Sequence, residues 1–177
     1  MIKDLSFLHI LTAVLVIELI MLFMFKFTNR TSVVINNWYN NLGWTSVILD
    51  VLSILIGFYI ALFIYDYLLR ENYINEKNEF SKFLMIVICV QIIHDISFYL
   101  FVIKPTALGK NKVIDEFKDY AKYYRGQAIV ADTMIYLFTT SILYYAIKTY
   151  SDKTNVFISL VCLYLIGYLL HQKSRYK

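Results

Sequence analysis

Residues 83–103 read FLMIVICVQIIHDISFYLFVI and are almost entirely apolar. A helix needs about 20 such residues to cross a bilayer, so this stretch predicts a transmembrane helix. Within it lie the adjacent ionisable residues His94 and Asp95. A charge at mid-membrane costs about 2.5–3.5 kcal/mol on insertion scales, and such residues are usually functional. The same stretch therefore predicts both a fold class and a candidate site.

Four other segments are similarly apolar, at residues 5–27, 43–65, 126–147 and 156–170. The chain has 177 residues, of which 59% are hydrophobic and 17% charged, whereas soluble domains carry about 25% charged residues. Few glycines and one proline argue against flexible linkers and β architectures. We predict one all-α membrane domain over residues 1–177, a polytopic transmembrane helical bundle with five spans. The fifth segment is the shortest and would also suit an interfacial or re-entrant helix.

The segment 109–124, before the fourth span, predicts a short amphipathic interfacial helix. Its apolar and aromatic residues recur at helical spacing, at Val113, Phe117, Tyr120 and Tyr124. We expect the rings of Phe117 and Tyr120 to lie among the lipid headgroups. We expect three lysines of the same segment to contact anionic headgroups: Lys112, Lys118 and Lys122. A solvated linker helix explains the pattern equally well.

The distribution of Lys and Arg near the span ends predicts the orientation. Six of these residues lie on one side of the five spans and eleven on the other, and the richer side should be cytoplasmic. The N-terminus would then be external, and the 109–124 segment and the C-terminus would be internal. Pro105 should end the third span, with Lys104 reaching the headgroups.

Buried acids recur at one depth. Since a helix rises about 1.5 Å per residue, four acids and one histidine fall roughly 10–14 Å from the basic membrane face: Glu18, Asp50, His94, Asp95 and Asp132. The acids come from four different helices. Gathered inside a bundle they could share protons, hydrogen bonds or a cation, so we interpret them as candidate ion- or proton-binding residues.

Polar neighbours of these acids would support such a layer. Three of them share a helix face with one of the acids: Ser53, Gln91 and Thr139. Gly57 lies on the Asp50 face and would allow another helix to approach closely. A hydrogen-bonded network that only fixes helix packing would produce the same pattern.

Other chemistry has little support in the sequence. One imidazole and three carboxylates would suit Zn, Mn or Fe (His94, Asp50, Asp95 and Asp132), but the spaced His and Glu pairs typical of such sites are missing. There is no phosphate-binding loop, nucleophile elbow, C-x-x-C pair or selectivity-filter sequence. We expect no cofactor beyond a bound cation. Nucleic-acid binding is not expected, because the basic residues flank membrane spans.

Three segments resemble a known family. They are LGWTSVILDVLSILIGFYIA (42–61), QIIHDISFYLFVIKP (91–105) and FKDYAKYYRGQAIVADTMIYL (117–137). They resemble an uncharacterised multi-pass membrane protein family of giant nucleocytoplasmic DNA viruses. The matching positions would include Asp50, His94, Asp95, Lys104, Pro105, Lys118, Asp119, Tyr120 and Asp132. The resemblance covers the middle two-thirds of the chain and implies a setting, in a host membrane or the internal membrane of a virion, without implying a mechanism.

These observations leave three functional hypotheses. The first is a small channel or transporter for protons or cations, with Asp50 and Asp132 as main sites, His94 as relay and Asp95 as its orienting partner. The second is a non-catalytic scaffold of a virion or host membrane, which would contact capsid proteins or further copies of itself. The third is a membrane-embedded metalloenzyme, and an enzymatic role has the least support of the three.

Overall fold

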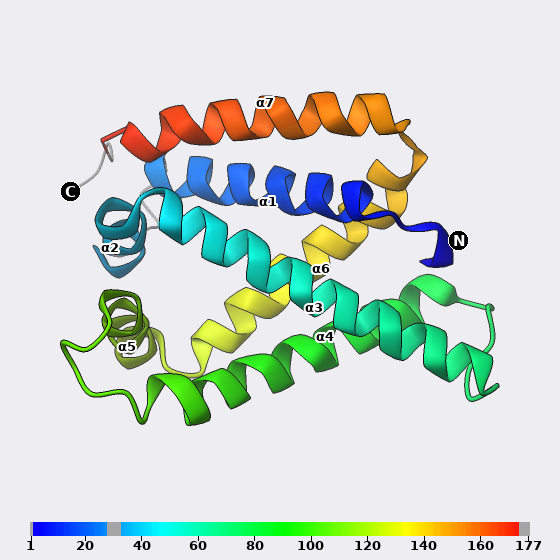
Figure 1. Ribbon diagram of the computed structural model, residues 1–177, viewed down its shortest axis with the longest axis horizontal. Helices are drawn as coiled ribbons and strands as arrows, with labels where there is room; N and C mark the ends of the chain where they lie inside the picture. Colours follow the sequence, from blue (N-terminus) through cyan, green and yellow to red (C-terminus); the bar gives the residue numbers. More distant parts are fainter. Residues whose placement is uncertain (1, 28–32, 174–177) are drawn as a thin grey trace.

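The computed structural model describes residues 2–27 and 33–173, and all regular elements in this part of the chain are helices. Five are long and apolar enough to cross a membrane, once α4 and α6 are counted with the short helical turns that extend them. These helices are α1 (Phe7–Phe27), α3 (Trp44–Arg70), α4 (Glu79–Phe98), α6 (Gln127–Tyr145) and α7 (Asp152–His171) (Figure 1). The predicted all-α bundle is confirmed.

Two shorter helices, α2 (Val33–Leu42) and α5 (Lys112–Tyr124), lie together at one end of the bundle (Figure 1). The α3–α4 and α6–α7 connections lie at the other end (Figure 1), so the five long helices alternate in direction as predicted. Which end is cytoplasmic stays a prediction. Three of the residues counted for it lie outside the described residues: Arg30, Arg175 and Lys177.

The helix α1 lies in the centre of the bundle and contacts α3, α6 and α7. Its residues Ile10, Ala13 and Val14 are fully buried. The contact with α7 includes a polar link, because Thr12 Oγ1 lies 2.9 Å from Ser159 Oγ. Between membrane helices, hydroxyls of this kind stabilise packing by hydrogen bonding across the interface.

The helices α3 and α6 approach closely at Gly57. The ring of Tyr136 stacks on Phe58 at 5.8 Å between centroids, and its hydroxyl donates to the Ser53 carbonyl oxygen at 3.3 Å. A Cβ atom at Gly57 would lie 2.6 Å from that hydroxyl. The structure therefore confirms that this small residue permits a second helix to approach.

The third span ends where the sequence predicted. After α4 the chain continues as one π-helical segment, Tyr99–Ile103. The Lys104 N–H donates to the Tyr99 carbonyl at 2.8 Å, and Pro105 follows. Lys104 still has helical backbone angles, and the helical hydrogen bonding stops at Pro105, which has no backbone N–H to donate to the preceding turn.

Side-chain caps define the starts of two helices. The Asn111 side chain accepts hydrogen bonds from the backbone N–H groups of Val113 and Ile114, so α5 begins three residues later than predicted. Ser151 caps α7 in the same way through Thr154. As a result α7 has 20 residues, which is long enough to span and longer than the predicted 156–170.

One flanking charge differs from expectation. Lys26 was counted as a cation at the end of the first span, but its side chain is only 1% exposed. Its Nζ donates to Asn40 Oδ1 of α2 at 3.0 Å. This lysine therefore binds α2 to the end of α1 and does not face a headgroup.

Candidate functional site

The four acids predicted to share a depth lie at the end of the bundle that α2 and α5 cover. We call Glu18, Asp50, Asp95 and Asp132 the carboxyl layer. Glu18 belongs to α1, Asp50 to α3, Asp95 to α4 and Asp132 to α6. Asp132 interacts electrostatically with both Asp95 and Asp50, and Glu18 interacts with Asp50. The prediction that these groups converge from four helices is consistent with this geometry.

One tyrosine bridges the first half of the layer. The Tyr39 hydroxyl of α2 lies 3.1 Å from Glu18 Oε1 and 3.4 Å from Asp50 Oδ2. The neighbouring Trp38 donates its Nε1 to the same Asp50 oxygen at 3.0 Å. Burial, and then the nearby carboxylates of Glu18 and Asp50, raise the pKa of Tyr39 well above its ordinary value. Its hydroxyl therefore keeps its proton and remains a donor.

The second half of the layer connects α4 and α6. The buried Gln91 amide donates from Nε2 to Asp95 Oδ2, and its Oε1 lies 2.8 Å from Thr133 Oγ1 of α6. Asp132 of α6 interacts electrostatically with Asp95. Two neighbouring carboxyl groups can share one proton, so this half of the layer can hold an exchangeable proton.

Tyr120 of α5 interacts electrostatically with members of both halves. Burial raises the pKa of Tyr120, and the carboxylates of Asp132, Asp50 and Asp95 raise it further. We expected this ring to contact lipid headgroups. It is half-buried and close to the carboxyl layer, so α5 contributes to the site as well as to the surface.

His94 is not inside the bundle, contrary to the prediction that it points into a shared site with Asp50 and Asp132. Its side chain is 44% exposed and stacks on Phe98, at 5.8 Å between ring centroids. Its Nδ1 lies 3.2 Å from Asp95 Oδ1. The predicted His94–Asp95 pairing is present, but on the outer side of the layer.

Two predicted supporting residues do not reach the carboxyl groups. The Ser53 hydroxyl donates to the Asp50 backbone carbonyl at 2.9 Å, and the Thr139 hydroxyl donates to Ile135 of its own helix at 2.8 Å. Both hydroxyls are thus satisfied within a helix, which threonine and serine achieve readily. Gln91 is the predicted supporting residue that does reach a carboxyl group, and Thr133, its partner on α6, is one that sequence reasoning missed.

The metal hypothesis receives no support from the geometry. Over residues 2–27 and 33–173, no three His, Cys, Asp or Glu side chains are grouped so that they could hold one ion. Asp132 interacts electrostatically with Asp50 and Asp95, and His94 turns outward.

The predicted contact residues of α5 have protein partners. Lys112 Nζ donates to the Asn41 carbonyl of α2 at 2.6 Å, and Lys118 Nζ lies 3.5 Å from the Lys104 carbonyl. The Phe117 ring packs between Trp38, at 4.7 Å, and Phe98, at 5.5 Å. These contacts attach α5 to α2 and to the end of the third span. Contact of the same residues with lipid stays a prediction.

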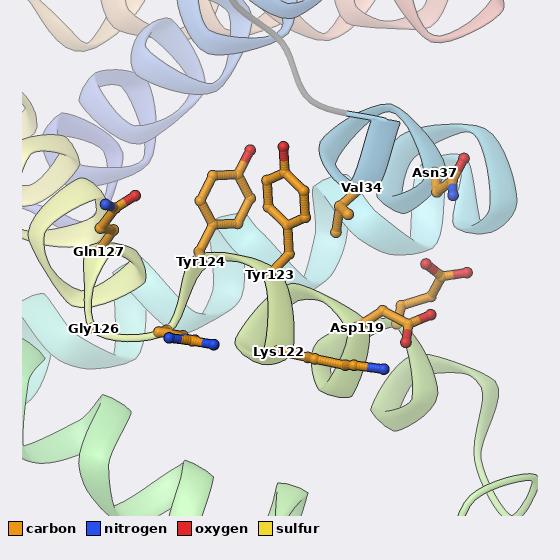
Figure 2. Close-up of a pocket in the computed structure, with 10 residues that line it drawn as sticks. Val34, Asn37, Asp119, Lys122, Tyr123, Tyr124, Gly126 and Gln127 are labelled. Carbon is orange, nitrogen blue, oxygen red and sulfur yellow. The ribbon is translucent and has the colours of Figure 1, made fainter.

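An open groove of about 840 Å³ runs between α2 and the end of α5. Figure 2 shows the neighbouring rings of Tyr123 and Tyr124, whose centroids lie 4.9 Å apart, with Val34 of α2 beside them. Lys122, predicted to contact lipid, extends from the same helix near Asp119 (Figure 2). Cations and acids therefore both border this groove.

The chain has no match among known protein families, curated proteins or solved structures. The geometry of the carboxyl layer is therefore the basis on which a function is inferred.

Proposed function

We propose that this chain is an integral membrane protein whose carboxyl layer binds protons or small cations and passes them across the bilayer. Five helices that are long and apolar enough to span support a multi-pass arrangement. The carboxyl layer lies within four of these helices, where ionisable groups typically form ion pathways and proton relays.

The observation that carries the proposal is the Tyr39 bridge. Its hydroxyl lies within hydrogen-bond distance of both Glu18 and Asp50. A proton can leave the Glu18 carboxyl for the Tyr39 oxygen while the Tyr39 proton moves to the Asp50 carboxylate. Tyrosine is then unchanged, and one proton has moved from α1 to α3. The interacting carboxyl groups of Asp95 and Asp132 offer a second pair between which a proton can move.

A flux assay tests this proposal. The purified chain is reconstituted in liposomes, and proton entry is followed with an internal pH dye under a potassium diffusion potential. We expect flux from the wild type and none from Asp50→Asn or Asp132→Asn, since the amide retains the shape and loses the titrating group. Asp66→Asn is the matched control, because Asp66 is exposed near the end of α3.

Tyr39→Phe distinguishes the two kinds of cargo. It removes only the exchangeable hydroxyl, so proton flux should stop, whereas flux of a metal cation bound by the carboxylates should continue when a sodium or potassium dye is used. Wild-type flux equal to that of protein-free liposomes would refute both forms of the proposal.

A scaffold role is the second candidate. It is favoured by the hydrogen bonds that Asp50 and Asp95 receive from Trp38 and Gln91, which would also fix helix packing. The α2–α5 pair would then be the contact surface. Its placement in a virion or host membrane, with capsid proteins as partners, is supported only by the sequence resemblance. Imaging of a tagged chain in infected cells would test that placement.

A further inference from the structure

The two short helices α2 and α5 cover the carboxyl layer unevenly. They run in opposite directions, and hydrogen bonds close the pair at the C-terminal end of α2. There Asn41 Nδ2 donates to Glu116 Oε1, and Lys112 Nζ donates to the Asn41 carbonyl, both at 2.6 Å. At the other end, near Val34 and Tyr124, the two helices border the open groove of about 840 Å³ (Figure 2). The cover is therefore closed at one end and open at the other.

A stripe of aromatic residues on α5 connects this groove with the carboxyl layer. Phe117, Tyr120 and Tyr124 lie at i, i+3 and i+7, which is one face of a helix. At one end of the stripe, Phe117 packs on Trp38, which donates to Asp50. At the other end, Tyr124 lines the groove, and its ring lies 4.8 Å from that of Tyr120. Along α5, Tyr120 therefore lies between the groove and the contact with the layer.

The Tyr120 hydroxyl is available for proton transfer. The side chain is half-buried, and its hydroxyl makes no hydrogen bond to the residues that the structure describes. It interacts electrostatically with Asp132 and Asp50. A phenolic hydroxyl can donate one hydrogen bond while it accepts another. Tyr120 can thus accept a proton on one side and give one up on the other.

The groove also brings polar surface close to the second half of the layer. Gln127 borders the groove at the start of α6, and Asp132 follows five residues later, about 7.5 Å along the helix. Asp119, Lys122 and Arg125 line the groove, and none of them forms an ion pair with a described residue. Charged groups of this kind keep a groove hydrated, so water lies close to the layer at this end.

We propose that this groove is the aqueous inlet of the carboxyl layer, and that Tyr120 relays protons from its water to Asp132. A hydronium ion in the groove gives a proton to the Tyr120 oxygen while the Tyr120 proton moves to the Asp132 carboxylate. The hydronium becomes water, the tyrosine is unchanged and Asp132 becomes neutral. The inference rests on the proton transfer proposed above and adds the route by which protons enter.

Filling the groove tests the inlet in the liposome flux assay. Gly126 borders the groove, and a side chain added there meets open space. Gly126→Trp should therefore lose most of the wild-type proton flux without a lower Tm. Leu108→Trp is the matched control and should conduct like the wild type, because Leu108 is exposed in the connection before α5 and does not line the groove. Wild-type flux from Gly126→Trp would overturn the inlet and leave the proposed function intact.

Removing one hydroxyl tests the relay. Tyr120→Phe should reduce proton flux by about tenfold or more, because a positioned proton-transfer group contributes at least that much. Tyr99→Phe is the control, since Tyr99 is exposed near the end of the third span and outside the groove. Equal flux from the two variants would overturn the relay.

Thiol labelling tests the inlet without any flux. Tyr120→Cys, in a chain lacking both native cysteines, should react in liposomes with a water-soluble methanethiosulfonate reagent. Adding Gly126→Trp should slow this reaction, whereas adding Leu108→Trp should not. No labelling, or equally fast labelling with either tryptophan, would overturn the inlet. Labelling that Gly126→Trp slows, in a chain whose wild type shows no flux, would support the inlet and refute the proposed function together with the relay.

Discussion

Replacing Tyr39 with phenylalanine should destabilise the fold at the carboxyl layer. The ring would remain packed on Phe25, at 5.9 Å between centroids, so the change is confined to the hydroxyl. Glu18 is 5% exposed and would lose the donor that lies 3.1 Å from its Oε1. A buried acceptor without its donor costs about 1–3 kcal/mol. Asp50 is affected less, because Trp38 still donates to it.

We expect the free energy of unfolding of Tyr39→Phe to fall by about 1–3 kcal/mol. A chain of this size loses about 2–4 °C in Tm per kcal/mol, so the Tm should fall by roughly 2–12 °C. The Tm can be measured in detergent in a Cys89→Ser background, where heating exposes the buried Cys162 thiol to a fluorogenic maleimide.

Tyr59→Phe is the control for this experiment. Tyr59 is exposed on α3, and its hydroxyl has no hydrogen bond to the described residues, so its removal should leave the Tm within about 1 °C. Equal Tm values for the Tyr39→Phe and Tyr59→Phe variants would show that the bridge does not stabilise the carboxyl layer.

Three further outcomes are expected. Burial raises the pKa of Tyr39 above its ordinary 10.0, so at high pH the folded chain keeps a proton that the unfolded chain loses. The free energy of unfolding should therefore fall above about pH 10, by at most ~1.4 kcal/mol per pH unit. Equal pH slopes in denaturant titrations of the wild type and Tyr39→Phe would contradict this. Gly57→Ala should cost about 1–3 kcal/mol in the same thermal assay through its clash with Tyr136, whereas Gly126→Ala, with open space around it, should be tolerated. Lys110→Cys, in a chain lacking both native cysteines, should resist an impermeant maleimide in intact cells and react after permeabilisation; labelling in intact cells would reverse the orientation.

The long helices could be predicted because apolar length is a strong constraint. Depth was equally informative, since counting residues from a span end placed the acids of four helices in one layer. The direction in which a side chain points around its helix was less predictable. His94 and Asp95 differ by one residue, which is about 100° around the helix, and this difference turns one outward and leaves the other facing Asp132.

The helix α2 was missed because its sequence, VVINNWYNNL, is short and half polar. Isolated helices of this length are marginal in water and depend on tertiary packing, here on α5 through the rings of Trp38 and Phe117. A signal was nevertheless present. Apolar pairs at 34–35 and 38–39 alternate with asparagine pairs at 36–37 and 40–41, which is the periodicity of an amphipathic helix.

The hydroxyl pair between α1 and α7 has a consequence for biosynthesis. Thr12 and Ser159 are 147 positions apart, and ribosomes add about 5–20 residues per second. The first span therefore waits roughly 7 to 30 s for its partner to be made. During that delay the Thr12 hydroxyl already donates to the Leu8 carbonyl of its own helix at 2.7 Å. This local bond lets α1 enter the bilayer early without an orphaned polar proton, and the later arrival of α7 adds a second bond to the same oxygen.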